Sequence, residues 1–324
     1  TTSIISVSVA ANSLTMTGAS ASTTGALTKA GVGKLIFSGK NSYSGVTNVS
    51  AGVLNIQNAS ALGTTTSGTA VSSGAALELQ GGITVGAEAL SLTGTGISGN
   101  GALRNISGDN TFGGTITLGG TTTIQSDAGS LTLSDITGGV SNRNLTIEGN
   151  GNGIINGNIT TGTGSVTKNN SGTWTLSGAN TYRGVTTISL GTLKLGGTGS
   201  GANSPLGTVA GATSITSGAV LDLNGFTLAT AEPLTIRGTG NSSGGALTNS
   251  SATAANYSGL LSLGAASSII TNAGDINITN AGTITGTYGL TLGGSGIGSV
   301  SSIIGTSTGT LTKTGTGTWT LSRA

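Results

Sequence analysis

The chain has 324 residues, of which only 6% are charged, and its formal net charge is +2. Cysteine and histidine are absent, which excludes disulfides, thiolate metal sites, cysteine nucleophiles and every triad or zinc site that needs an imidazole. Basic residues are scattered singly and no apolar run is long enough for a membrane-spanning helix, so neither a nucleic-acid footprint nor a direct membrane span is expected.

Short alternating runs recur along the chain and predict strands with one buried face. Each run has a period of two residues and is bounded by Gly, Asn or Ser, while helical periodicity is missing throughout. The 61 glycines also disfavour helices, since each costs a helix close to 1 kcal/mol. In chain order the clearest predicted strands are 53–57, 76–80, 131–134, 145–149, 221–225 and 290–294.

A long internal repeat organises these strands. Residues 27–56 align without a gap on residues 166–195, with 13 identities in 30 positions, and a third copy begins at Leu311. The sequence between the copies repeats as well, since residues 77–96 match residues 221–240. We therefore predict one continuous segment, 1–324, made of four parts: the end of a preceding repeat (1–26), repeat 1 (27–165), repeat 2 (166–310) and the start of a third repeat (311–324).

Runs this short are not stable alone, because even two-stranded hairpins are marginal in water. Stacking them in coils gives each strand a neighbour above and below, with Val, Ile and Leu inside and Thr, Ser and Asn outside. The predicted fold is therefore all-β, a parallel β-helix (β-solenoid) of two large repeats of about 140 residues plus partial flanking repeats, with coils of roughly 20 to 25 residues. A sandwich of ordinary β domains is the competing architecture.

The stretch "GTWTLSGANTYRGVTTISLGTLKLG", followed by "NSPLGT" at 203–208, resembles the passenger-associated transport repeat, also called the autotransporter-associated β-strand repeat. Residues 31–63 resemble it equally well, and the fragment from Thr310 is a truncated copy. The resemblance implies a right-handed β-helical passenger of a bacterial autotransporter, exported across a Gram-negative outer membrane and displayed or shed at the cell surface. It also implies that this sequence is a segment of a longer chain, because a signal peptide and a translocator barrel are not seen in it.

The positions that recur between the copies are expected to be structural rather than ligand-binding. Trp174 aligns with Leu35, and an aliphatic replacement fits a core position better than a sugar-stacking platform. The recurring Asn, Tyr and Gly are expected to form a turn corner in which Asn bonds the backbone, Gly adopts a positive φ and the ring covers the bend. Arg183 aligns with Ser44 and is expected in solvent. The repeat motif comprises Lys29, Leu35, Asn41, Tyr43, Gly45, Lys168, Trp174, Asn180, Tyr182, Gly184, Lys313 and Trp319.

The nine carboxylates offer little to catalysis. Two of them recur at an offset of 144 residues, Glu78 with Asp222 and Glu88 with Glu232, which favours turn hydrogen bonds or spaced negative charges over a site used once. Asp127 and Asp135 lie eight residues apart and leave a calcium site open, although their aligned counterparts, Asn272 and Asn280, keep only the turn chemistry. No catalytic, cofactor-binding or metal-binding residue and no cofactor is predicted.

The function predicted from these features is mechanical. A rigid β-helical rod or fibre with a flat Thr/Ser/Asn surface suits adhesion, display or self-association end to end or side by side at the bacterial cell surface or outside the cell. Host, cell-surface or polysaccharide ligands are the expected partners. The alternative is a carbohydrate-active β-helix enzyme, a polysaccharide lyase or hydrolase. A further alternative is a secretion and folding segment whose adhesive tip lies elsewhere.

Overall fold

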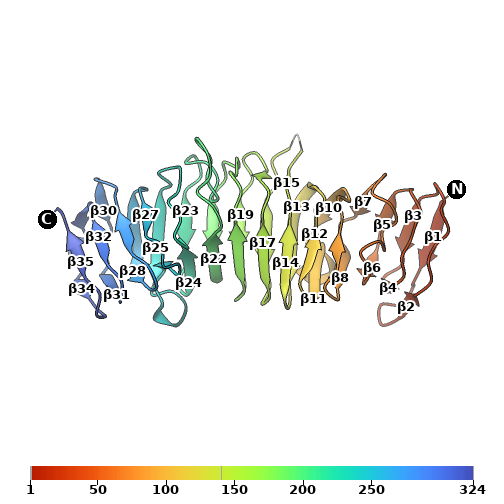
Figure 1. Ribbon diagram of the computed structural model, residues 1–324, viewed down its shortest axis with the longest axis horizontal. Helices are drawn as coiled ribbons and strands as arrows, with labels where there is room; N and C mark the ends of the chain where they lie inside the picture. Colours follow the sequence, from red (N-terminus) through yellow and green to blue (C-terminus); the bar gives the residue numbers. More distant parts are fainter. Residues whose placement is uncertain (1, 140, 324) are drawn as a thin grey trace. The chain divides into compact units, whose positions relative to one another are not determined.

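The computed structural model describes residues 2–139 and 141–323 and divides into two compact units, Thr1–Gly164 (unit 1) and Ser165–Ala324 (unit 2). Figure 1 labels most of the strands of each unit. The predicted segment begins at Thr1 and ends at Ala324, and repeat 1 includes Val140; these three residues lie outside the described part of the chain.

Unit 1 consists of short strands and one 3-10 turn, joined by loops in which many glycines have a positive φ. Its elements are β1 (Ser3–Ser6), β2 (Ser13–Met16), β3 (Leu27–Ala30), β4 (Lys34–Phe37), β5 (Thr47–Val49), β6 (Gly52–Ile56), β7 (Thr69–Val71), β8 (Ala75–Gln80), β9 (Thr84–Val85), β10 (Leu90–Gly94), η1 (Ile97–Gly99), β11 (Leu103–Ser107), β12 (Asn110–Phe112), β13 (Ile116–Ser126), β14 (Ser130–Leu133), β15 (Ile136–Thr137), β16 (Leu145–Glu148), β17 (Asn152–Ile155) and β18 (Ile159–Thr160).

Unit 2 repeats this design and also contains one 3-10 turn. Its elements are β19 (Val166–Lys168), β20 (Thr173–Leu176), β21 (Thr186–Ile188), β22 (Gly191–Leu195), β23 (Thr213–Ile215), β24 (Ala219–Asp222), β25 (Leu234–Gly238), η2 (Asn241–Ser243), β26 (Leu247–Asn249), β27 (Ala255–Tyr257), β28 (Leu261–Thr271), β29 (Ile276–Ile278), β30 (Thr283–Thr285), β31 (Leu290–Gly294), β32 (Gly298–Val300), β33 (Ile303–Gly305), β34 (Leu311–Lys313) and β35 (Trp319–Leu321).

Within each unit most strands pair in parallel with a strand one turn further along the chain. Leu27 of β3 lies beside Thr47 of β5, which in turn lies beside Thr69 of β7, so these two turns take 20 and 22 residues. Other turns are longer, since Gly191 of β22 lies beside Ala219 of β24, 28 residues further on. This arrangement is a parallel β-solenoid and confirms the predicted fold class. No helix among the described residues has the length and hydrophobicity needed to cross a membrane.

The interior of each unit is filled by columns of aliphatic side chains that stack from turn to turn. In unit 1 one column runs through β4, β6, β8, β11, β13 and β16 and comprises Leu35, Leu54, Leu77, Leu103, Ile124 and Ile147. The matching column of unit 2 comprises Trp174, Leu193, Leu221, Leu247, Ile269 and Leu292. Nearly all of these side chains are completely buried, so each alternating run supplies one apolar face to a continuous core.

Candidate functional site

The lysine that opens the repeat motif lies inside the solenoid. The side chain of Lys29 is fully buried, and its Nζ donates to the backbone carbonyls of Ala30, Gly31 and Ala51 at 2.8, 2.7 and 2.9 Å. These carbonyls belong to two successive turns, so the ammonium ties one coil to the next. Burial lowers the pKa of Lys29 because it penalises the charged form.

The second and third copies of this lysine repeat the arrangement in part. Lys168 is also fully buried, and its Nζ donates to the carbonyls of Asn169, Asn170 and Leu190 at 2.7, 2.7 and 3.0 Å. Lys313 is exposed, and its Nζ donates to the carbonyls of Thr314 and Gly315 at 2.6 and 2.9 Å. The repeat comparison identified these positions, but only the coil geometry shows that they hold the turns through carbonyl bonds.

The recurring Asn and Tyr side chains bond within the fold. Asn41 donates to the carbonyl of Ala61 at 2.7 Å, and Asn180 donates to that of Pro205 at the same distance. Tyr43 and Tyr182 are buried, and each phenol shares a hydrogen bond of 2.7 Å with a threonine four residues later, Thr47 and Thr186.

The glycine of this corner serves a different purpose from the one expected. Gly45 does not have a positive φ, so the expectation of a left-handed backbone there is wrong. A Cβ at Gly45 would lie 2.1 Å from the carbonyl oxygen of Gly25. Glycine is required because neighbouring coils approach closely at this point, rather than because of its conformational freedom.

The aligned positions of the tryptophans lie on an inner face. Leu35 and Trp174 are fully buried and occupy equivalent places in the aliphatic columns. Neither side chain is therefore available for stacking against a sugar. Trp319 is half-buried, and its indole N–H donates to the carbonyl of Gly293 at 3.1 Å. Arg183 is exposed.

The two acids of the repeated pair Glu88 and Glu232 are buried, at 2% and 0% exposure. Each accepts a hydrogen bond from an inward threonine, Thr69 to Glu88 at 2.9 Å and Thr213 to Glu232 at 3.0 Å. Burial raises the pKa of Glu88, and it raises that of Glu232 to about 8. These bonds join side chains 19 residues apart and are not the expected turn hydrogen bonds. Surface charge against wrong stacking does not describe these acids either, because both are buried.

An outward column of hydroxyl side chains follows one face of each unit; we call it the hydroxyl ladder. In unit 2 each ladder position from Thr167 to Thr285 carries a hydroxyl, and the next position is Gly305. Thr235 shares a hydrogen bond of 2.8 Å with Ser262. The ladder comprises Thr28, Asn48, Ala70, Ser91, Thr117, Thr137 and Thr160 in unit 1, and Thr167, Thr187, Ser214, Thr235, Ser262 and Thr285 in unit 2. Neighbouring rungs of a parallel sheet lie about 4.8 Å apart, so the ladder presents uncharged groups at a regular spacing.

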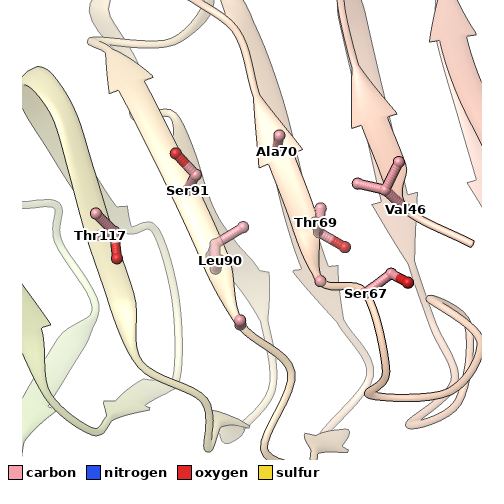
Figure 2. Close-up of a pocket in the computed structure, with 9 residues that line it drawn as sticks. Val46, Ser67, Thr69, Ala70, Leu90, Ser91 and Thr117 are labelled. Atoms are coloured by element: carbon pink, nitrogen blue, oxygen red, sulfur yellow. The ribbon is translucent and has the colours of Figure 1, made fainter.

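The ladder of unit 1 is hollowed where its side chains are smallest. Figure 2 shows Ala70, Ser91 and Thr117 on neighbouring strands around this hollow, which has a volume of about 210 Å³. Gly68 and Ala89 complete the small-residue lining. At the place in unit 2 that matches Thr93, Arg237 instead lies across the ladder, and its guanidinium donates to Ser214 at 2.8 Å.

A second outward face of unit 1 carries a charged cluster. Glu78 accepts from Lys34 at 2.8 Å and lies 3.7 Å from Arg104, which bonds Asp127 at 2.6 Å. Asn55, the rung neighbour of Glu78, also donates to its carboxylate at 3.1 Å. The cluster spans five successive turns through charges that pair with one another and the amide of Asn55, an arrangement typical of a structural network.

Asp135, the second candidate cation ligand, is exposed and accepts a hydrogen bond from the backbone N–H of Asn158 at 2.7 Å. This hydrogen bond joins residues of two successive coils. Among the described residues no group of three or more acidic side chains is placed to hold a metal ion.

The sequence alone did not indicate that the ladder residues form a surface. It also did not indicate that the buried threonines and glutamates form pairs. Alternation does mark positions such as Thr28, Thr187 and Ser214 as outward. Their alignment in one column depends on coil lengths that vary from turn to turn, and the sequence alone does not give that register.

Comparison with known proteins identifies the repeat. The family model of the passenger-associated-transport-repeat matches residues 27–56, 166–195 and 311–324. Over 194 residues, which is 60% of this chain, the sequence is 34% identical to the adhesin BmaC autotransporter of Brucella suis biovar 1 (strain 1330). The matched part spans 4% of the length of that relative. No solved structure matches the chain.

Proposed function

We propose that this chain, which carries the passenger-associated transport repeat and is similar to part of an autotransporter adhesin, is a structural and adhesive segment of a bacterial surface protein. It acts outside the cell or at the cell surface, where the solenoid provides a rigid support and its outer faces provide contact area. The observation that supports this proposal most is the hydroxyl ladder. Its uncharged groups lie in register on successive turns and can make many weak contacts with a neutral partner.

The repeat motif serves the support in this proposal. The buried lysines connect one coil to the next through carbonyl partners, and each buried tyrosine bonds a threonine four residues later. The aligned Leu35 and Trp174 fill the core. These residues are therefore expected to control stability and to leave ligand binding unchanged as long as the coils stay folded.

The segment is proposed not to be an enzyme. The buried acids lie below the surface, and the charged cluster of unit 1 satisfies its own charges, with Arg104 held between Glu78 and Asp127. Release of unsaturated or reducing sugars from a panel of acidic and neutral polysaccharides, abolished by Asp127→Asn or Asp135→Asn, would instead establish the lyase or hydrolase alternative.

Adhesion through the ladder is tested with beads that carry the purified 324-residue segment. Beads are allowed to settle on films of a neutral glucan and of anionic alginate, and the fraction that resists a calibrated flow is counted. We expect retention on the neutral film, and Ser91→Lys with Thr117→Lys should reduce that retention several-fold, because charge on the ladder opposes close contact with an uncharged surface.

Thr132→Lys is the matched control, since Thr132 lies on β14 outside the ladder and is half-exposed. It adds the same charge to the same unit and should leave retention unchanged. Equal losses from the ladder variants and from the control would reject the ladder as the adhesive face. No retention of the native segment on either film would reject adhesion to these polysaccharides.

Self-association is a further part of the proposal. A second copy of the chain can offer the same uncharged ladder, so side-by-side contact is the expected form. Sedimentation velocity at increasing concentration should show reversible growth that Ser91→Lys with Thr117→Lys removes. A single species at all concentrations would limit the segment to contacts with other partners.

A further inference from the structure

Each unit contains the same chain of buried polar groups, repeated at an offset of 139 to 144 residues. In unit 1, Tyr43 bonds Thr47, whose rung neighbour Thr69 bonds Glu88. Unit 2 has the same sequence of contacts through Tyr182, Thr186, Thr213 and Glu232. In unit 1 the two threonines interrupt an inner column between Leu27 and Leu90, and the acid lies buried in the loop before β10.

No cation in the described part of the chain forms an ion pair with either acid. The ion pairs found among the described residues involve Glu78, Asp127 and Asp222 and include neither Glu88 nor Glu232. The hydrogen bond from threonine occupies one oxygen of each carboxyl, and the second oxygen of Glu232 is buried without a hydrogen-bond partner. A buried, unpaired charge costs far more than a buried neutral acid with the same contacts.

The titratable groups that face these acids are phenols. Tyr43 faces Glu88, while Tyr182 and Tyr257 face Glu232. Burial raises the pKa of Tyr43 to about 12 and raises those of Tyr182 and Tyr257 well above their ordinary value, so all three stay neutral in the range where a carboxyl titrates. Tyr257 donates its hydroxyl proton to the backbone carbonyl of Glu232 at 2.6 Å and therefore does not stabilise the carboxylate.

We propose that the coils carrying Glu88 and Glu232 fold around a neutral carboxylic acid and that these two acids act as proton-operated locks, which hold the coils closed in acid and loosen them when the carboxyls ionise. This inference goes beyond adhesion, since it concerns the solution conditions under which each unit keeps its shape.

The direction of the pH effect follows from linkage. The folded state keeps the carboxyl proton above pH 4.5, where the unfolded chain has released it, so the folded state binds more protons between pH 4.5 and the raised pKa. The stabilisation contributed by each neutral acid is therefore fully present at acid pH and is lost as the pH rises. For Glu232 the fall continues to a pH of about 8, where its folded-state pKa lies.

In unit 1 the lock lies directly beneath the hollow of the ladder. Thr69, which donates to Glu88, lines the hollow, and so does Ala89, the residue after Glu88. Figure 2 shows Thr69 at this position. Ionisation of Glu88 therefore acts on the wall of the hollow, and the lock couples pH to the shape of the outer face.

The test uses the segment labelled with ¹³C at the glutamate carboxyls. The chain has only four glutamates, so the carbon spectrum resolves Glu78, Glu88, Glu148 and Glu232 as four signals, assigned by single Glu→Gln variants. We expect two of them, Glu88 and Glu232, to titrate above the usual range, with Glu232 the higher. Titration of both below pH 5 would overturn the proposal.

A thermal experiment on the same chain tests the lock itself. The unfolding midpoint of the native segment should fall between pH 5 and a pH of about 8, and the variant that combines Glu88→Gln with Glu232→Gln should lose most of that dependence. Asp109→Asn, an exposed acid in unit 1, is the control and should keep the native slope. A native slope in the double variant would also overturn the proposal; if that variant fails to fold, the carbon titration of the native segment decides.

Discussion

The two units share their interior and differ on one outer face. Inside, Tyr43, Thr47 and Glu88 have the same contacts as Tyr182, Thr186 and Glu232. Outside, the column that reads Asn55, Glu78, Arg104, Gln125 and Glu148 in unit 1 reads Lys194, Asp222, Thr248, Ile270 and Gly293 in unit 2.

The difference teaches which positions the fold constrains. An inner position must match the volume and the hydrogen bonds of the coils on both sides, because interiors are closely packed. An outer position points away from the aliphatic core, so charged, hydroxyl or aliphatic groups are all compatible with the coil, even where neighbouring side chains cover them, as at Glu78 and Asp222. Recognition is therefore expected to differ between the units, while stability is expected to depend on equivalent residues.

The largest effect is expected from the shared core. Trp174→Ala removes a fully buried ring from the aliphatic column of unit 2 and should lower the free energy of unfolding by about 3–5 kcal/mol in urea denaturation. Trp319→Ala is the control, since that ring is half-buried, and it should cost clearly less. Similar losses for both would contradict the equivalence of Trp174 with the core position Leu35.

The buried lysines come next. Lys29→Met and Lys168→Met each leave carbonyls of two adjacent coils without their donor, which costs about 2–3 kcal/mol in unfolding free energy. The two losses should agree closely, because the ammonium contacts are the same in both units. Lys40→Met, at an exposed position, should change stability by less than about 0.5 kcal/mol. Hydrogen-exchange mass spectrometry would locate each loss in its own unit.

Substitution in the charged cluster should affect the stability of unit 1 in a way that has no counterpart in unit 2. Arg104→Ala removes the partner of Asp127 and should lower the unfolding free energy of unit 1 by about 1 kcal/mol at low salt, less in 1 M NaCl. Thr248→Ala, at the matching place in unit 2, should show no comparable salt dependence. A salt-independent loss at Arg104 would mean that its side chain acts through packing instead.

The smallest effect is expected at Arg183. Its side chain is exposed, and the first copy of the motif has Ser44 in its place. Arg183→Ser should therefore stay within about 0.5 kcal/mol of the native stability, measured by urea denaturation. A larger change would show that the two corners of the repeat are not equivalent.

Much of the architecture was predictable from the sequence. Alternation with period two indicated strands, and the density of glycine excluded helices. The exchange of Trp174 for Leu35 between aligned copies indicated an inner position. The expectation of a positive φ at the corner glycine was wrong, however. Glycine is required at Gly45 because Gly25 of the neighbouring coil approaches it closely, and local turn rules do not describe a contact between residues 20 positions apart.

The sequence by itself determined the repeat, the strand pattern and the chemistry that a chain without cysteine or histidine cannot perform. These properties depend on residue type and on spacing along the chain. Only the tertiary structure decided that Lys29 binds carbonyls of two coils, that Glu88 and Glu232 are buried beside threonines, and that hydroxyls form a ladder. Each of these depends on which residues of successive turns lie side by side, and turns of unequal length set that register through packing.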